Sequence, residues 1–148
     1  MDPKRRKKTI LIVEDDPVIA TLIGFMLNDP DYLVVGSAAT AEEAIDAAQK
    51  QKPDLILMDI HLKGQMDGIE TARTLWWDYH IPVIFITADA DDVTFQRAMK
   101  TSPLGFIKKP LSRKLFALTL KMAFLRYEEE EKRGDLKFRS AEVNFRDI

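Results

Sequence analysis

The chain has 148 residues, of which 46% are hydrophobic and 31% charged, and it contains no cysteine. This length and composition predict one globular domain with a modest extension. The absence of cysteine excludes disulfides, cysteine-based zinc sites and a cysteine nucleophile. No apolar run approaches the roughly 20 residues of a membrane span, and no signal-peptide pattern is visible. We therefore expect a cytoplasmic protein without a membrane span.

The formal net charge of −2 hides an uneven distribution of 22 basic and 24 acidic residues. Removing one basic run leaves 17 basic against 24 acidic residues; the run consists of Lys4, Arg5, Arg6, Lys7 and Lys8. The rest of the chain lacks the positive excess of nucleic-acid-binding domains, so we expect no direct nucleic-acid binding. Residues 1–8 are predicted to form a basic, disordered tail, and binding of the run to an anionic surface is the alternative.

Five short apolar runs predict β-strands. They are rich in Val, Ile, Leu or aromatic residues and are too short for helices, which is typical of strands buried on both faces of a parallel sheet. In chain order they are residues 9–13, 32–36, 54–58, 82–86 and 105–107.

Segments with helical spacing lie between these runs, over residues 17–27, 40–51, 67–77 and 91–100, and a fifth follows Pro110. Asp16 before Pro17 is a predicted N-cap, and Thr40 with Glu43 matches a capping box. Alternating strands and helices predict a doubly wound α/β fold with right-handed crossovers and helices on both faces of the sheet. In such folds the ligand site lies beyond the carboxyl ends of the strands.

Polar side chains follow four of the five predicted strands. They are Glu14, Asp15 and Asp16 after the first, Asp59 after the third, Thr87 after the fourth, and Lys108 and Lys109 after the fifth. Clustered carboxylates without histidine or thiol ligands favour Mg²⁺, and a lysine with a hydroxyl suits the oxygens of a phosphoryl group. Because the chain has neither a GxxxxGKS/T nor a GxGxxG loop, the pattern indicates phosphoryl chemistry without a bound nucleotide.

From Thr9 to Arg126 the sequence resembles the receiver domain of two-component response regulators. The resemblance rests on four segments in the family's order and at its intervals: ILIVEDDP, DLILMDIHLKGQMDGIETA, PVIFITA and GFIKKP. It implies a flavodoxin-like fold whose five-stranded parallel sheet has the order 2-1-3-4-5, with a receiver domain over residues 9–126. It also implies a signalling domain that catalyses only its own phosphorylation and dephosphorylation.

The resemblance assigns Asp59 as the phosphoacceptor, which takes its phosphoryl group from a histidine kinase or a histidine phosphotransfer domain. The implied Mg²⁺ ligands are Glu14, Asp15, Asp59 and the backbone carbonyl of His61.

The same resemblance implies that Thr87 and Lys109 assist the transfer. Lys109 is favoured over Lys108 because it directly precedes the proline. Thr87 and Phe106 are the implied switch residues, which repack the face formed by the fourth helix, fifth strand and fifth helix.

Two alternative functions stay open at this point. The loop at residues 61–65 lacks a proline and is one residue longer than the family pattern, which favours a receiver-like scaffold or dimerisation module with marginal phosphorylation. A phosphohydrolase with an aspartyl nucleophile ranks last, because it needs a second acid where the chain has His61.

The C-terminal part predicts a long helix and a linker. Five apolar residues form a heptad seam expected to pack on the sheet and continue beyond it: Leu111, Leu115, Leu118, Met122 and Leu125. The acidic run at residues 128–131 is either a solvated helix end or part of a signalling helix that pairs with another copy. A homodimer is therefore expected through the fourth helix, fifth strand and fifth helix, or through the C-terminal helix.

Residues 127–148 are predicted as a helical linker to a further module. Their last nine residues, SAEVNFRDI, resemble the segment that often precedes a PAS sensory domain.

Overall fold

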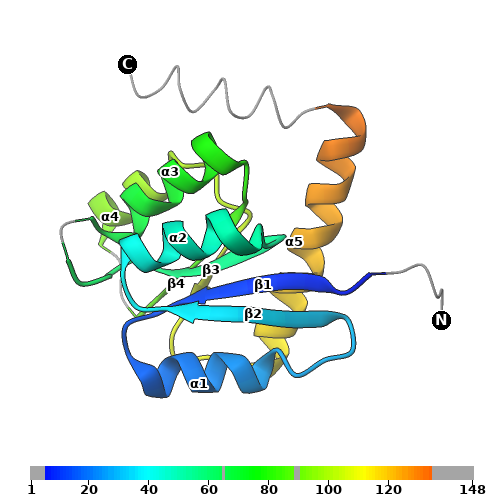
Figure 1. Cartoon of the computed structure of the whole chain (residues 1–148), viewed down its shortest axis with the longest axis horizontal. Coiled ribbons are helices and arrows are strands. Elements are labelled where there is room, and N and C mark those ends of the chain that lie inside the picture. Colours follow the sequence, from blue (N-terminus) through cyan, green and yellow to red (C-terminus); the bar gives the residue numbers. More distant parts are fainter. Residues whose placement is uncertain (1–5, 65, 89–90, 135–148) are drawn as a thin grey trace.

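The computed structural model describes residues 6–64, 66–88 and 91–134 of the chain. Five parallel strands form one sheet in the order β2-β1-β3-β4-β5 (Figure 1). The strands are β1 (Lys8–Val13), β2 (Tyr32–Ala38), β3 (Leu55–Asp59), β4 (Val83–Thr87) and β5 (Gly105–Lys108). The helices are α1 (Pro17–Met26), α2 (Ala41–Gln51), α3 (Gly68–Tyr79), α4 (Asp92–Met99) and α5 (Arg113–Arg133). The predicted doubly wound α/β fold and strand order are confirmed.

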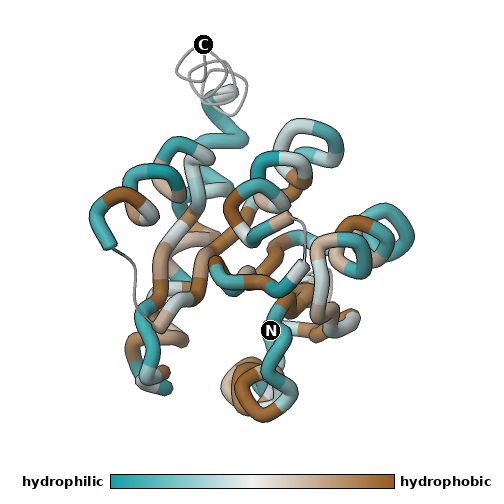
Figure 2. The backbone as a smooth tube through the Cα atoms, turned by 90° about the vertical axis from the view of Figure 1, so that its left-hand side faces the viewer, coloured by the Kyte–Doolittle hydropathy of each residue, from teal (hydrophilic) through white to brown (hydrophobic). Residues whose placement is uncertain are grey.

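The helices cover both faces of the sheet, with α2, α3 and α4 on one face and α1 and α5 on the other (Figure 1). The alternation of side chains along each strand divides the core accordingly. In β1, Leu11 and Val13 join the cluster beneath α2, α3 and α4, while Ile10 and Ile12 join the cluster beneath α1 and α5. Figure 2 shows the hydrophobic residues concentrated along the central strands.

The expectation that every strand is buried on both faces is wrong for β2. Leu33 and Val34 are 49% and 36% exposed, whereas all residues of β3 and β4 are buried. These side chains are exposed because β2 lies at the edge of the sheet and pairs only with β1.

Side chains cap the helices where the sequence predicts it. The Asp16 carboxylate accepts a hydrogen bond from the Val18 amide at 2.9 Å, and the Thr40 hydroxyl accepts one from the Glu43 amide at 3.2 Å. The capping box differs from the expected pattern in its second bond, since the Glu43 carboxylate accepts from Ala39 rather than from Thr40. Asp16 therefore serves as a cap, which accounts for its place beside the other acids.

Of the five predicted seam residues only Leu111, just before α5, packs against the core, so the expectation is wrong for the other four. The side chains of α5 buried against the sheet are Phe116, Leu120, Ala123 and Phe124. Four seam residues instead face away from it, with exposed fractions of 62%, 50%, 62% and 56%: Leu115, Leu118, Met122 and Leu125. The heptad spacing identified one face of the helix, but bulkier side chains on the opposite face fill the core.

Regular structure extends across both expected domain boundaries. Lys8, the last residue of the expected tail, is the first residue of β1, and Arg6 forms a two-bond ion pair with Asp54. At the other end, α5 passes without a break through residues 126 and 127 to Arg133. The segment resembling a PAS linker, residues 140–148, lies outside the described residues. In the described part of the chain, no helix is long and apolar enough to cross a membrane.

Candidate functional site

Three carboxylates meet at the carboxyl edge of the sheet. Glu14 and Asp15 directly follow β1, and Asp59 is the last residue of β3. One oxygen of each lies within 4.8 Å of the others. Glu14 and Asp59 are buried, at 4% and 6% exposure, whereas Asp15 is partly accessible. The order of the strands produces this cluster, because β1 and β3 are direct neighbours.

A lysine side chain lies beside the carboxylates. The Lys109 ammonium is 2.8 Å from a Glu14 carboxylate oxygen and 4.0 Å from an Asp59 oxygen. The Lys109 amide also donates to the Thr87 carbonyl at 2.7 Å, which ties the end of β5 to the end of β4. Lys108 pairs with Thr87 in the sheet and has an exposed side chain. The structure thus brings Lys109, and not Lys108, to the acidic cluster.

Burial raises the free-energy cost of keeping the Glu14 carboxylate charged. The pKa of Glu14 is raised, mainly because burial penalises the charged carboxylate and also because Asp59 is close. The Lys109 ammonium opposes this shift. A cation bound among these acids would therefore reduce the repulsion between the Glu14 and Asp59 carboxylates, which Lys109 offsets only in part.

Backbone contacts hold Asp59 and the turn that follows it. The His61 amide donates to an Asp59 carboxylate oxygen at 3.0 Å, and the Gly68 amide donates to the Ile60 carbonyl at 3.0 Å. The N-terminus of α3 packs so closely here that a Cβ on Gly68 would collide with the Asp59 carbonyl and lie 2.9 Å from the Ile60 Cα. Sequence reasoning missed this role of Gly68, which only the DG pair at the start of α3 could have indicated.

The two predicted switch residues lie on neighbouring strands. Thr87 is the last residue of β4 and is 1% exposed. Phe106, in β5, is half-buried between two aromatic rings, with ring centroids 5.2 Å from Phe95 of α4 and 6.3 Å from Phe85 of β4. A change in the Phe106 side chain would therefore be transmitted directly to α4.

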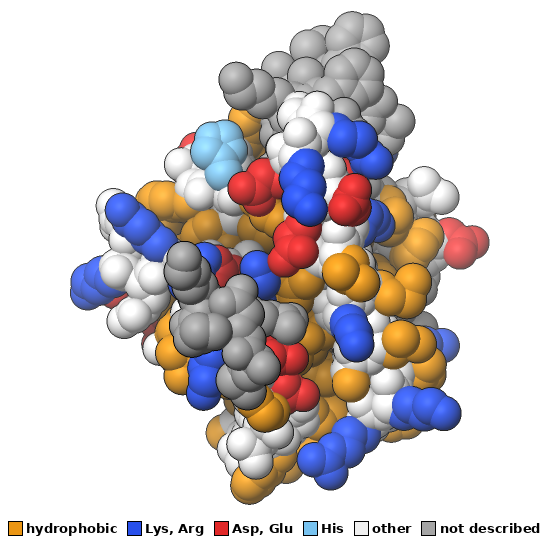
Figure 3. Space-filling model, turned by 90° about the vertical axis from the view of Figure 1, so that its right-hand side faces the viewer, with side chains coloured by type: hydrophobic (Ala, Val, Ile, Leu, Met, Phe, Trp, Pro, Cys, Tyr) orange, Lys and Arg blue, Asp and Glu red, His pale blue; other side chains and the backbone are white. Residues whose placement is uncertain are grey.

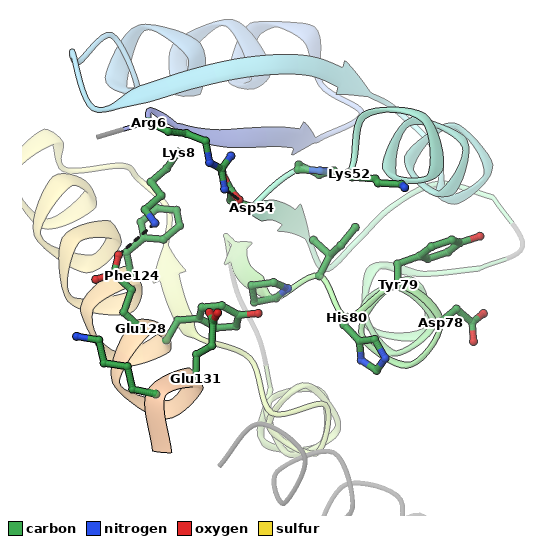
Figure 4. Close-up of a pocket in the computed structure, with 15 residues that line it drawn as sticks. Arg6, Lys8, Lys52, Asp54, Asp78, Tyr79, His80, Phe124, Glu128 and Glu131 are labelled. Atoms are coloured by element: carbon green, nitrogen blue, oxygen red, sulfur yellow. Dashed lines mark hydrogen bonds and ion pairs between the residues drawn. The ribbon is translucent and has the colours of Figure 1, made fainter. Parts of the chain in front are cut away.

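Two of the hollows among the described residues lie at opposite ends of the sheet. One of about 290 Å³ is lined in part by Glu14 and Asp15. A larger one of about 900 Å³ lies between the start of β1 and the C-terminal half of α5 (Figure 4). Two ion pairs lie along it, between Arg6 and Asp54 at 2.9 Å and between Lys8 and Glu128 at 3.1 Å. The acidic cluster, rather than the larger hollow, gathers the groups suited to phosphoryl chemistry.

Comparison with known proteins identifies the family. Residues 10–121 match the model of the response regulator receiver domain. The chain belongs to this family. As a receiver domain, it is a signal-transduction module of two-component systems.

Solved structures share the fold of this receiver domain. It is similar to the signal receiver domain of a modulated diguanylate cyclase from Desulfovibrio desulfuricans G20, with 36% identity, a TM-score of 0.79 and coverage of 84% of this chain and 99% of that one. It is also similar to the N-terminal domain of a response regulator/sensory box/GGDEF 3-domain protein from Carboxydothermus hydrogenoformans, with 34% identity, a TM-score of 0.75 and coverage of 83% and 98%.

Longer proteins contain similar receiver domains. A protein-glutamate methylesterase/protein-glutamine glutaminase of Syntrophus aciditrophicus is 39% identical over 68% of this chain and 30% of its own length. The DNA-binding response regulator MtrA of Mycolicibacterium smegmatis is 30% identical over 88% of this chain and 55% of its own length. The chain thus spans between about a third and about half of these two relatives.

Proposed function

We propose that the chain is a phosphoaccepting receiver in which Asp59 takes a phosphoryl group from a histidine kinase or a histidine phosphotransfer domain in the cytoplasm. The observation that carries this proposal is the meeting of Glu14, Asp15 and Asp59 with the Lys109 ammonium at one sheet edge. Beyond its own phosphorylation and dephosphorylation, no catalytic role is assigned to the chain.

The donor set fits Mg²⁺, because it consists of hard carboxylate oxygens within reach of one another. Glu14, Asp15, Asp59 and the backbone carbonyl of His61 would hold the ion. When bound, Mg²⁺ supplies positive charge to the oxygens of the transferring phosphoryl group.

The chain's own residues supply the rest of the transfer. An Asp59 carboxylate oxygen attacks phosphorus and forms the P–O bond of an acyl phosphate, while the P–N bond to the donor imidazole breaks and its electron pair stays on the leaving nitrogen. Lys109 exchanges its contact with Glu14 for the phosphoryl oxygens, since its ammonium lies between the two carboxylates. Positioning and electrostatics therefore account for the catalysis.

Phosphorylation then favours a second arrangement of the switch residues. The Thr87 hydroxyl turns toward the new phosphoryl oxygens, and Phe106 moves into the space beside it. Because Phe106 packs edge to face on Phe95, this movement alters the surface of α4. Phosphate thus biases a two-state equilibrium of the α4–β5–α5 face.

The decisive experiment is mass spectrometry after incubation with Mg²⁺ and a small phosphodonor. The wild type gains one phosphoryl group and Asp59→Asn gains none. Asp16→Asn is the matched control, because Asn also caps helices and Asp16 is exposed beside the cluster; it keeps the modification.

A second matched pair tests the lysine. Lys109→Met should slow phosphorylation strongly, whereas Lys108→Met should leave its rate unchanged, because the Lys108 side chain is exposed. Phosphorylation of Asp59→Asn, or no labelling of the wild type under conditions that label other receivers, would contradict the proposed function.

A further inference from the structure

The ion pair between Arg97 and Asp67 joins α4 to the start of α3. The Arg97 guanidinium donates a hydrogen bond to an Asp67 carboxylate oxygen at 3.2 Å. Charged side chains also lie close together on the side of the molecule that α5 covers (Figure 3), but a pair there such as Arg126 with Glu130 joins two residues of the same helix. A pair within one helix is indifferent to the neighbouring elements, whereas a pair between two helices depends on how those helices lie.

The charges that face Arg97 from α3 are mainly acidic. Asp67 is the N-cap of α3 and Glu70 lies in its first turn, with a carboxylate oxygen 4.0 Å from the same guanidinium nitrogen. Arg73 follows Glu70 by three residues, on the same side of α3, and competes for its carboxylate. The other charged residues at the two ends of α4 are Asp91, Asp92 and Lys100. Asp67 is therefore the main partner of Arg97, because it lies nearest.

Few side chains hold α4 to the rest of the domain. Among the residues of α4, all of which are described, only Ala98 is buried, and Phe95 packs edge to face on Phe106 at 5.2 Å. Phe95 and Arg97 are two residues apart, so they project about 200° apart around the helix axis. Phe106 and Asp67 therefore contact α4 from opposite sides. Because so little of the helix is buried, one ion pair supplies a sizeable share of what keeps α4 in place.

Asp67 is fixed in turn to the backbone around the phosphoacceptor. Its other carboxylate oxygen accepts from the Glu70 amide at 2.9 Å, and its carbonyl accepts from the buried Thr71 hydroxyl at 2.6 Å. The next residue, Gly68, packs directly on the Asp59 carbonyl. A displacement of Asp67 is therefore passed to the turn that follows Asp59.

We propose that Arg97 is a positioning residue that couples α4 to this turn through Asp67. In the unphosphorylated protein the ion pair holds α4 against the start of α3. This inference rests on the proposed function, in which phosphorylation moves Phe106 and α4 responds. Because Phe106 and Asp67 contact opposite sides of α4, the helix follows Phe106 only by separating Arg97 from Asp67, and a separation beyond about 3.5 Å ends the hydrogen bond. The pair thus opposes the switch in the absence of phosphate.

Hydrogen exchange of the α4 amides, in the full 148-residue chain without a phosphodonor, tests the coupling. Exposed ion pairs contribute modestly, so Arg97→Met should raise the exchange rates about two- to fivefold. Asp67→Asn should have the same effect, because asparagine keeps the N-cap but loses the charge. The double variant should exchange no faster than Arg97→Met, since both changes remove one interaction. Unchanged rates or additive effects would overturn the inference.

Lys100→Met is the matched control. It removes the same charge from the exposed end of α4 and should leave the exchange rates unchanged; an increase equal to that of Arg97→Met would assign the effect to net charge and overturn the inference. Arg97→Lys should fall between the wild type and Arg97→Met, because its ammonium keeps the charge without the planar guanidinium. The buried β3 amides should keep wild-type rates in every variant, which verifies that the domain is folded.

Titration with beryllofluoride, a mimic of the phosphoryl group, tests the release of the pair. In the presence of Mg²⁺, Arg97→Met and Asp67→Asn should each bind the mimic about two- to fivefold more tightly than the wild type in calorimetry, because nothing then holds α4 against α3. Once the mimic is bound, the wild type and Arg97→Met should show equal α4 exchange. An unchanged affinity, or a difference in exchange that persists in the bound state, would overturn the inference.

The two experiments separate this inference from the proposed function. If the wild type binds no mimic and accepts no phosphate, the proposed function fails. The exchange rates without a phosphodonor still decide whether Arg97 couples α4 to Asp67.

Discussion

Replacing Gly68 with alanine tests whether the start of α3 sets the position of the phosphoacceptor. The added Cβ would collide with the Asp59 carbonyl and lie 2.9 Å from the Ile60 Cα. Neither atom belongs to a flexible side chain, so the backbone itself must shift. Overpacking of this kind costs about 1 to 3 kcal/mol. We expect Gly68→Ala to lose that much stability and to slow phosphorylation of Asp59.

Gly24→Ala is the matched control. Gly24 lies within α1, and a Cβ there meets no atom within 4 Å. Alanine is a better helix former than glycine by roughly 0.5 to 1 kcal/mol, so this variant should be more stable than the wild type. The same chemical change therefore has opposite effects at the two positions, with a difference of about 1.5 to 4 kcal/mol.

Urea unfolding measures this difference. With a slope of about 2 kcal/mol per molar urea, the midpoints of the two variants should differ by roughly 1 to 2 M. If Gly68→Ala unfolds at or above the wild-type midpoint and is phosphorylated at the normal rate, the close approach of α3 to Asp59 does not constrain the site, and the reasoning fails.

Three further predictions concern stability. Asp59→Asn in the absence of Mg²⁺ should stabilise the fold by about 1 kcal/mol in thermal unfolding, because Asp59 helps to raise the pKa of buried Glu14; a lower midpoint would contradict this. Burial raises the pKa of Asp54, but hydrogen bonds from Thr9 and Arg6 outweigh burial, so the net pKa is lowered. The ionised Asp54 carboxylate therefore stabilises the fold at any pH above its unfolded pKa. This stabilisation is lost as the pH falls through the lower pKa of the folded state. Asp54→Asn should therefore cost about 1 to 2 kcal/mol at neutral pH, and its deficit in urea unfolding should shrink below about pH 4; a deficit independent of pH would refute this sign. Thr40→Ala should cost about 1 kcal/mol in the same assay, because the Glu43 amide loses its cap, and an unchanged midpoint would show that the bond contributes nothing.

Much of the site was predictable because polar residues at the ends of apolar runs are a local signal. Glu14, Asp15 and Asp59 follow buried strands, and the parallel topology alone brings them together. Gly68 was not predictable in this way. Its importance comes from the close approach of α3 to the Asp59 backbone. Hydrophobic periodicity along the sequence does not indicate such a contact.

Secondary structure followed from the sequence to within a few residues, since strand length, N-caps and helical spacing are local properties. Burial did not follow, because it depends on neighbours. The apolar run of β2 is partly exposed at the edge of the sheet, while similar runs in β3 and β4 are fully enclosed.

The sequence by itself determined the order of the elements, the fold class and the residue types at the carboxyl edge of the sheet. Only the tertiary structure decided which face of α5 meets the core. Heptad spacing shows which side chains share a face of the helix, but it does not show what that face contacts. α5 has apolar side chains on more than one face, and the tertiary packing determines which of these faces is buried. In α5 the sheet is covered by Phe116, Leu120, Ala123 and Phe124, and the four heptad residues within the helix remain exposed.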